Sequence, residues 1–553
     1  MLLNKFWRSK SGNFTLVLGL GLPVILTAVA FATDVSTLMR AKSNLQNALD
    51  SANLASSHLG DLDITRNDAF NRYFQANIVG HGELDNAQAT LTVDKGVNFV
   101  KTKAVASADV HLNFAFLFGD SKHIVVDASA VESNNQLEVV LVLDNTGSMA
   151  GARMTALRTA TKSLLDTLEA AKSPTRKIRA SPVPFVTAVN VNGDGFDPSW
   201  IDMDGKSSTN GVNFPVIDGK RPNHMALFKQ LKKTGWADAG WNGTGWKGCV
   251  EARPGAYNIS DTPPDPAKPD TLFVPYFAPD DPEDAQKPSG SYGNSDKYYN
   301  NSYLNDVSDK TRLAQSGINI LGIDLSNLLG NLIELLSPDD RDAREKIAKY
   351  VAPAKELITE IGSPVTVGPN RACPTPVVPL TDDFDKLRKA ASQMTEWNGS
   401  GTNVSEGLSW GMRVLSPAAP YTDGAPWKTP GISKIVLLLT DGENVVYGAS
   451  EQEPTKSDYT SYGYLAGGRF GSDNQTTAAR NVDGWTKNVC TQLKNEGVQI
   501  YTMVLQSDTA ANRALYSACA SDPSNYYAVN DPTKLPNVFL QIANNFTKLQ
   551  LTN

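Results

Sequence analysis

The chain contains little of what several common classes of functional site require. It has only five histidines, and they are scattered, so a histidine-based zinc site is not the leading expectation. The net charge is −7 and the pI is near 5.4, whereas nucleic-acid-binding proteins usually present a basic face. We therefore expect no nucleic-acid partner. A bound metal is expected to be a hard cation that takes oxygen ligands.

One long apolar run stands near the N-terminus. No charged side chain occurs in residues 11–33, and about 20 apolar residues at 1.5 Å per residue can cross a bilayer as a helix. Lys5, Arg8 and Lys10 precede this run. Positive charge on the short N-terminal side predicts that this end stays in the cytoplasm and that the chain after Asp34 is exported.

The alternative to a transmembrane helix is a cleaved signal peptide, since residues 28–30 (Ala-Val-Ala) match the A-x-A cleavage pattern. The apolar run, however, is longer than the hydrophobic region of a usual signal peptide. The helical pattern also continues past the candidate cut, because leucines and alanines recur mostly every three or four residues from Leu38 to Ala55. We therefore favour a retained helix.

The four cysteines, Cys249, Cys373, Cys490 and Cys519, include no Cys-x-x-Cys pair. They permit three disulfide connectivities, among which sequence alone cannot choose. Export favours disulfides because these bonds persist outside the cytoplasm. We favour Cys249–Cys373 with Cys490–Cys519, because each pair falls within one region of the chain. The alternative is four buried thiols, since free cysteine often behaves as a small core residue.

The length and composition indicate a globular protein of more than one domain. A chain of 553 residues is too long for one ordinary core, and 41% of its residues are hydrophobic and 20% charged. We expect residues 1–60 to form the N-terminal tail, the transmembrane helix and a juxtamembrane helix. Residues 61–135 are expected to form a small β-rich module, with strands near 89–93, 97–105, 110–118 and 123–131.

The main domain, residues 136–553, alternates strands and helices. Strands are expected at 137–144, 178–185, 434–440, 498–505 and 526–529. Helices are expected near 152–171, 382–396, 404–415, 476–495, 510–519 and 532–549. This alternation predicts an α/β fold with a doubly wound, mostly parallel sheet. Residues 190–380 interrupt it as a large irregular insert, which is either a set of functional loops or an inserted subdomain.

Oxygen-bearing side chains follow two of the expected strands. Asp144 ends the strand LEVVLVLD, and Thr146 and Ser148 follow it in a tight loop; one carboxylate and two hydroxyls suit Mg²⁺ or Ca²⁺. Such a D-x-[ST]-x-S match is weak alone, and its simplest alternative is a helix N-cap at Asp144. Thr402 in a glycine-rich loop and Asp441 after the next apolar strand are expected at the same edge of the sheet. That conjunction is specific.

This conjunction resembles the metal-ion-dependent adhesion site of the von Willebrand factor A domain family, which combines D-x-S-x-S with a distant Thr and a distant Asp. The resemblance implies a von Willebrand factor A-type fold in which a cation, Mg²⁺ or else Ca²⁺ or Mn²⁺, is bound by Asp144, Thr146, Ser148, Thr402 and Asp441. Some of these ligands would act through water, and a carboxylate of a protein partner would take an open coordination position. Thr146 replaces the usual Ser but keeps the hydroxyl, so we expect it to remain a ligand.

Three further segments resemble TadG-like proteins of the tight-adherence (Flp) pilus system. Two, GCVEARPGAY and RACPTPVVPLT, lie within the insert, and ATDVSTLMRAKSNLQNALDSANLAS resembles the TadE/TadG-like anchor region. Pseudopilins of this system typically carry a Glu just after the processing Gly, whereas Gly12 is followed by Asn13, Phe14 and Thr15. We therefore expect an uncleaved anchor. The resemblance implies a single-pass protein of the bacterial inner membrane, with a cytoplasmic N-terminus and a periplasmic main domain.

Three classes of function remain open. The leading hypothesis is a membrane-anchored, extracytoplasmic component of Flp pilus biogenesis that binds a protein partner through its metal. Pilus components or other TadE/TadG-like proteins are the expected partners. The second hypothesis is a structural envelope protein whose metal only stabilises the fold. The weakest is a metal-dependent hydrolase, for which Glu443 is the only nearby candidate base. We therefore expect no enzymatic activity.

Overall fold

The computed structural model divides the chain into two compact units. The smaller unit comprises residues 1–135 and 547–553, and the larger comprises residues 136–546. The residues that the structure describes are 13–57, 63–95, 99–114, 119–133, 136–174, 176–214, 221–233, 240–281, 301–304, 319–320, 323–324, 350, 367–448, 455–547 and 550–551.

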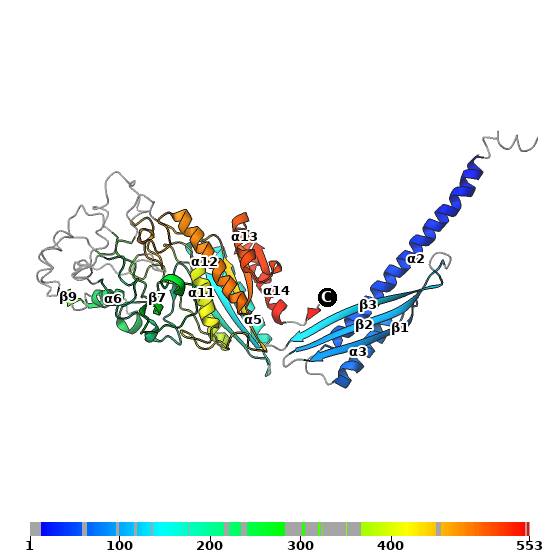
Figure 1. Cartoon of the computed structure of the whole chain (residues 1–553), viewed down its shortest axis with the longest axis horizontal. Helices are drawn as coiled ribbons and strands as arrows, with labels where there is room; N and C mark the ends of the chain where they lie inside the picture. The colour runs from blue at the N-terminus through cyan, green and yellow to red at the C-terminus, as the bar shows by residue number, and fades with distance from the viewer. Residues whose placement is uncertain are drawn as a thin grey trace, which may run out of the picture. The chain divides into compact units, whose positions relative to one another are not determined.

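The smaller unit is built on one long helix, α2 (Asn13–Ala55), with a second helix, α3 (Asp63–Ile78), packed against it (Figure 1). By length and composition, α2 contains one stretch, Leu18–Ala55, that can cross a membrane. Five of the leucines and alanines that recur along residues 38–55 are buried on one side of α2. We call them the stripe of α2: Ala41, Leu45, Ala48, Leu49 and Ala52. The predicted continuation of the helix beyond the apolar run is therefore present, whereas α3 was not predicted.

An antiparallel sheet completes the smaller unit. It contains β1 (Leu84–Lys95), β2 (Phe99–His111), β3 (Ser121–Ser133) and β13 (Gln550–Leu551), in that order. Along β2, Ala104, Ala106 and Ala108 are buried with the stripe of α2, while Lys101 and Lys103 are exposed, as a period of two requires. The prediction of a separate strand at 110–118 is wrong for the described residues 110–114, because β2 continues through residue 110 and ends at residue 111.

The larger unit contains a five-stranded parallel sheet. Its strands are β4 (Gln136–Asp144), β5 (Ile178–Phe185), β10 (Ile432–Thr440), β11 (Gln499–Leu505) and β12 (Tyr526–Val529), in the order β12-β11-β10-β4-β5. The first strand lies inside the sheet: the chain adds β5 on one side of β4 and later adds β10 on the other. The winding direction therefore reverses between β4 and β10. This is the predicted doubly wound, parallel sheet, and the predicted α/β fold class is confirmed.

Helices cover both faces of this sheet (Figure 1). One face carries α5 (Ala152–Ala170), α10 (Phe384–Gln393) and α14 (Leu535–Thr547); the other carries α11 (Val404–Leu415), α12 (Gln475–Asn495) and α13 (Ala510–Cys519). The strand β4 shows why both faces need cover. Leu141 and Leu143 pack in the first core and Val140 and Val142 in the second, and all four are fully buried. A strand buried on both faces is apolar throughout, as β4 is.

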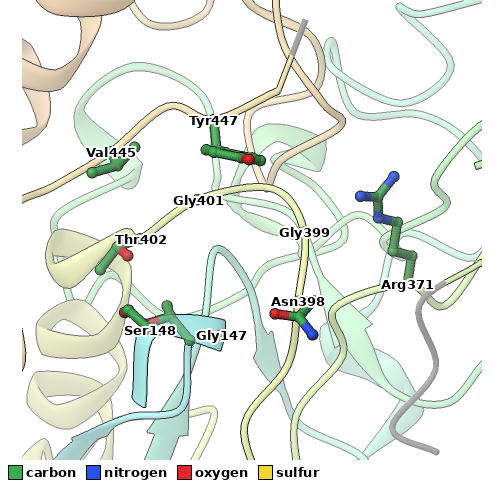
Figure 2. Close-up of a pocket in the computed structure, with 10 residues that line it drawn as sticks. Gly147, Ser148, Arg371, Asn398, Gly399, Gly401, Thr402, Val445 and Tyr447 are labelled. Carbon is green, nitrogen blue, oxygen red and sulfur yellow. The ribbon is translucent and has the colours of Figure 1, made fainter. Parts of the chain in front are cut away.

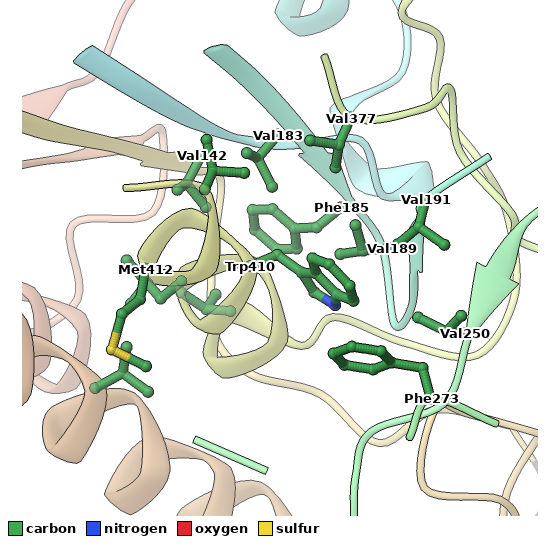
Figure 3. Close-up of a cluster of buried hydrophobic side chains, with 14 of the residues drawn as sticks. Val142, Val183, Phe185, Val189, Val191, Val250, Phe273, Val377, Trp410 and Met412 are labelled. Atoms are coloured by element: carbon green, nitrogen blue, oxygen red, sulfur yellow. The ribbon is translucent and has the colours of Figure 1, made fainter. Parts of the chain in front are cut away.

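The described part of the insert is a packed extension of the second core. It contains β6 (Val189–Asn190), which pairs with β7 (Cys249–Val250), α6 (His224–Lys233), and the pair β8 (Asn319–Ile320) and β9 (Ile323–Asp324). Figure 3 shows Phe273 of the insert beside Trp410 of α11, and their ring centroids are 4.7 Å apart. Buried aromatic residues, rather than regular secondary structure, thus stabilise this region.

Two disulfides join distant parts of the larger unit. Cys249 of β7 is bonded to Cys373, and Cys490 of α12 is bonded to Cys519 of α13. These are the two pairs that the sequence favours over the other connectivities. All four cysteines of the chain are thereby bonded.

Candidate metal centre

The candidate site lies at the point where the sheet reverses its winding direction. Asp144 is the last residue of β4, and Asp441 directly follows the neighbouring parallel strand β10. Because both strands run in the same direction, their carboxyl ends meet at one edge of the sheet, where open α/β folds bind ligands. The topology therefore brings together two carboxylates that are almost 300 residues apart in the sequence.

A tight loop positions the first group of oxygen atoms. The backbone amide and the hydroxyl of Thr146 both donate hydrogen bonds to Asp144 Oδ1, at 2.8 and 2.7 Å, and the hydroxyl of Thr440 donates to Asp144 Oδ2 at 2.7 Å. A 3₁₀ turn, η1 (Gly147–Met149), then presents Ser148. A Cβ at Gly147 would lie 2.1 Å from Asn398 Oδ1, so this position accepts only glycine without rearrangement.

The second carboxylate is connected to the first loop through side chains. The Ser148 hydroxyl lies 3.0 Å from the Thr146 hydroxyl and donates to Asp441 Oδ1 at 2.8 Å. On its other side, Asp441 Oδ2 accepts a hydrogen bond from the guanidinium of Arg153 at 2.7 Å. Asp144, Thr146, Ser148 and Asp441 therefore form one continuous hydrogen-bonded set.

Thr402 reaches the site from a third loop, immediately before α11. Its amide donates to the carbonyl of Val445 at 2.9 Å, and the amide of Val445 donates back at 3.0 Å. Gly401 has a φ of +86°, and a Cβ there would lie 2.0 Å from the carbonyl oxygen of Val445. The close approach of the two segments therefore requires glycine. Figure 2 shows the side chains of Thr402 and Ser148 next to each other.

Burial and charge repulsion disfavour the charged form of Asp144. Asp144 is fully buried, and its burial, followed by the nearby charge of Asp441, raises the pKa of Asp144 to about 7 from its ordinary value of 3.8. The hydrogen bonds from Thr146 and Thr440 lower this pKa and compensate only in part. A cation between the two carboxylates would relieve both their repulsion and the cost of burying their charges.

The donor set suits a hard divalent cation. Two carboxylates and three hydroxyls supply only oxygen, which Mg²⁺, Ca²⁺ and Mn²⁺ accept and softer metals do not prefer. Within the described residues, no three His, Cys, Asp or Glu side chains come together to bind a metal. Binding here would thus depend on the hydroxyls of Thr146, Ser148 and Thr402 as well as on the acids. The residues present fit the cation that the motif implies.

The site opens into a cavity of about 400 Å³. Thr146, Ser148 and Thr402 line one part of its wall. Asn398, Arg371, Val445 and Tyr447 are among the residues that form the rest, and Figure 2 shows Arg371 on the far side of the loop that carries Gly399. A cation at the site would therefore be accessible to a ligand from outside.

The structure brings all five residues predicted for the site together: Asp144, Thr146, Ser148, Thr402 and Asp441. Two residues that hydrogen-bond to the carboxylates of the site, Thr440 and Arg153, were not predicted from the sequence. Thr440 could have been found from its place directly before Asp441, at the end of the same apolar strand. Arg153 gave no such signal, because a basic residue in the first turn of a helix is ordinarily a solvated one.

Comparison with known proteins bears mainly on the N-terminus. Residues 12–57 match the family model described as putative Flp pilus-assembly TadE/G-like. The N-terminal segment is TadE/G-like. This segment contains the whole of α2, including the apolar run and the buried stripe. No curated protein sequence matches the chain.

Several solved structures show a distant likeness to this chain. The pilus adhesin SpaC from Lactobacillus rhamnosus GG is 11% identical over 85% of this chain and 35% of its own, with a TM-score of 0.29. The von Willebrand factor domain of the type V pili tip protein Mfa5 from Porphyromonas gingivalis is 10% identical over 74% and 95%, with a TM-score of 0.31. The pilus adhesin RrgA from Streptococcus pneumoniae is 12% identical over 85% and 51%, also with a TM-score of 0.31. The chain spans about a third of the length of SpaC. Likenesses this weak carry no argument about function.

Proposed function

We propose that this chain is a membrane-anchored, extracytoplasmic component of Flp (tight-adherence) pilus biogenesis that binds a protein partner through a divalent cation. Asp144, Thr146, Ser148, Thr402 and Asp441 would bind the cation, directly or through water. Mg²⁺ is the expected ion, with Ca²⁺ or Mn²⁺ as substitutes. A carboxylate of the partner would complete the coordination, and pilus components or other TadE/TadG-like proteins are the expected partners.

One observation carries the proposal: two carboxylates at adjacent strand ends are linked through hydroxyls and lie beside an open cavity. Asp441 is hydrogen-bonded to Ser148, which is hydrogen-bonded to Thr146, which in turn is hydrogen-bonded to Asp144. A metal that served only to stabilise the fold would need no access to solvent. The cavity of about 400 Å³ beside Ser148 and Thr402 therefore favours binding over pure stabilisation.

The N-terminal half of α2 supports the anchoring. Large apolar side chains between Leu18 and Phe31 are exposed along the helix, as expected for a segment surrounded by lipid. The three basic residues before the helix favour a cytoplasmic N-terminus, and this orientation would place the larger unit outside the cytoplasm. In a bacterium that assembles Flp pili, the anchor would lie in the inner membrane.

Hydrolysis is the weaker candidate. A metal-bound water would need a base to accept its proton. Among the described residues that line the cavity there is no His, Lys, Asp or Glu, and Glu443 is exposed and is not among them. The site therefore favours a binding protein over an enzyme.

The test uses the full-length chain in detergent micelles. Mg²⁺ affinity is measured by calorimetry, and the chain then serves as bait for envelope proteins of the bacterium that produces it, with either Mg²⁺ or EDTA. We expect Mg²⁺-dependent capture of a defined partner. Asp144→Ala and Asp441→Ala should abolish both Mg²⁺ binding and capture while the circular dichroism spectrum is unchanged. Asp166→Asn, which removes an exposed carboxylate from α5, is the matched control.

The outcomes separate the three functions. Capture that is equally strong in EDTA would overturn the proposal that partner binding depends on the metal. If Mg²⁺ raises the melting temperature without changing capture, the ion is structural. Metal-dependent turnover of a phosphate or ester substrate that is lost in Asp144→Ala would establish a hydrolase instead.

A further inference from the structure

Two exposed large apolar side chains of the larger unit lie together at the candidate metal centre. Among its described residues, only Val445 and Tyr447 are both large, apolar and exposed, at 40% and 56%. Scattered apolar residues are ordinary on a protein surface. These two, however, are separated by a single residue, and both line the cavity that contains Ser148 and Thr402. We call Val445 and Tyr447 the apolar shelf.

The apolar shelf is fixed to the candidate ligands by the backbone. Val445 exchanges both of its backbone hydrogen bonds with Thr402, at 2.9 and 3.0 Å. The carbonyl of Tyr447 accepts a hydrogen bond from the amide of Asp458 at 2.9 Å. For a bound partner whose carboxylate contacts the cation, the apolar shelf would therefore lie at a constant position. This preorganisation lowers the entropic cost of binding.

The same residue that fixes Tyr447 also fixes a positive charge. Asp458 Oδ2 accepts hydrogen bonds from the guanidinium of Arg371 at 3.0 Å and from the amide of Ser400 at 3.4 Å. Arg371 is the one charged residue among the described residues that line the cavity. Because Asp458 pairs with this charge, a divalent cation at the site would supply the attraction for an acidic ligand, whose carboxylate would take an open coordination position.

The cavity is larger than one carboxylate requires. An apolar cavity of about 150 Å³ is enough for a benzene ring, whereas this cavity measures about 400 Å³. It can therefore accept a carboxylate and a neighbouring side chain of aromatic size. Volume, charge and the apolar shelf together describe an acidic side chain next to an apolar one.

We propose that the cavity recognises a peptide segment of the partner protein in which an acidic residue adjoins an aromatic or large aliphatic residue. The carboxylate is directed to the cation, and the apolar side chain packs on Val445 and Tyr447. This proposal rests on the proposed function, because it assumes that the cation binds a carboxylate. It adds the residue type that determines which acidic segments are accepted.

The test uses fluorescein-labelled, capped tetrapeptides and the full-length chain in detergent micelles with Mg²⁺. One probe carries Asp followed by Phe between glycines, a second carries Phe followed by Asp, a third carries Asp with glycines only, and a fourth carries Asn followed by Phe. Fluorescence anisotropy gives the affinities. We expect at least one of the two Asp- and Phe-containing probes to bind about ten-fold more tightly than the Asp–Gly probe, since most of a phenyl ring is buried. The Asn–Phe probe should not bind.

Substitution of the apolar shelf should remove this ten-fold gain alone. The double variant Val445→Ser, Tyr447→Ser should bind the Phe-containing probes no better than the Asp–Gly probe, with Mg²⁺ affinity unchanged. Tyr73→Ser, which removes an exposed tyrosine of α3, is the matched control and should behave like the wild type.

The failures of the two proposals differ. If Mg²⁺ and the Asp–Gly probe bind but Phe gives no gain, or if the gain survives in the double variant, the shelf proposal is overturned while the proposed function stands. If no Asp-containing probe binds in a Mg²⁺-dependent way, the carboxylate-binding function itself fails. A change of Mg²⁺ affinity in the double variant would show that the shelf acts on the metal site rather than on the ligand.

Discussion

Arg153 Nη1 lies 2.7 Å from Asp441 Oδ2, so the first turn of α5 forms an ion pair with the carboxylate at the end of β10. The same nitrogen donates to the carbonyl of Ser148 at 2.7 Å, and Arg153 Nε donates to Gln506 Oε1 at 2.7 Å. The side chain of Asp441 is only 3% exposed, whereas that of Arg153 is 32% exposed. The guanidinium thus partly neutralises a carboxylate that a cation would also use.

Removing this positive charge should strengthen cation binding. A unit charge several ångströms from a divalent cation costs roughly 1 kcal/mol even at the dielectric constant of water. We therefore expect Arg153→Gln to tighten Mg²⁺ binding about five-fold, measured by titration calorimetry of the full-length chain. Lys162→Gln is the control, because it removes one exposed positive charge from the same helix. An equal or weaker affinity in Arg153→Gln would mean that Arg153 serves to orient Asp441.

Thr146, the second oxygen-bearing residue of the loop, should contribute to cation binding through its hydroxyl alone. Thr146 Oγ1 donates to Asp144 Oδ1 at 2.7 Å and lies 3.0 Å from Ser148 Oγ. Thr146→Ser keeps this hydroxyl and should leave the Mg²⁺ affinity within about two-fold. Thr146→Val keeps the shape without the hydroxyl and should weaken binding by roughly 10- to 100-fold, as for the loss of a residue that orients a metal ligand. Equal affinities in the two variants would remove Thr146 from the proposed ligand set.

The elements that could be predicted from the sequence are those with a strong periodic signal. The five strands of the larger unit and its main helices follow the predicted segments to within a few residues at each end, because a doubly covered sheet needs apolar strands and amphipathic helices. The positions of Asp144 and Asp441 then follow from topology, since parallel strands place their carboxyl ends together.

The features that could not be predicted depend on contacts between distant segments. The backbone pairing of Thr402 with Val445 joins two loops with no sequence pattern in common, and it determines where the apolar shelf lies. The insert is packed by aromatic contacts such as Phe273 with Trp410, which lack the period of a helix or a strand. Helix α3 was missed because its polar residues dominate its composition.

The disulfides should contribute unequally to stability. In the chain-entropy description, a bond that closes a longer loop restricts the unfolded chain more; the separations are 124 residues for Cys249–Cys373 and 29 for Cys490–Cys519. The corresponding contributions are roughly 5 and roughly 3.5 kcal/mol. We expect the double variant Cys249→Ala, Cys373→Ala to lose more unfolding free energy in urea than the variant lacking the other pair. Thiol labelling of the unfolded, unreduced wild type should find no free thiol; four labelled cysteines would refute both bonds.

His224 should make the larger unit less stable at mildly acidic pH. It is the only histidine of that unit and is fully buried, with Nδ1 2.9 Å from the carbonyl oxygen of Pro275 and 3.5 Å from Glu251 Oε1. Burial lowers the pKa of His224 below its ordinary 6.5, and the charge of Arg469 lowers it further, although Glu251 opposes both effects. The folded state therefore favours the neutral imidazole. The stability that this provides is fully present above pH 6.5 and is lost as the pH falls toward the lowered pKa, by at most about 1.4 kcal/mol per pH unit.

Comparison with His224→Gln isolates this effect from the other groups that titrate in the same unit, Asp144 among them. A glutamine can still donate a hydrogen bond to the carbonyl of Pro275 but does not titrate. Between pH 7.5 and pH 5.5, the wild type should therefore lose more unfolding free energy than His224→Gln, as measured by urea denaturation in EDTA. Parallel losses in the two proteins would mean that the imidazole of His224 is accommodated equally well in both protonation states, and the prediction would then be wrong.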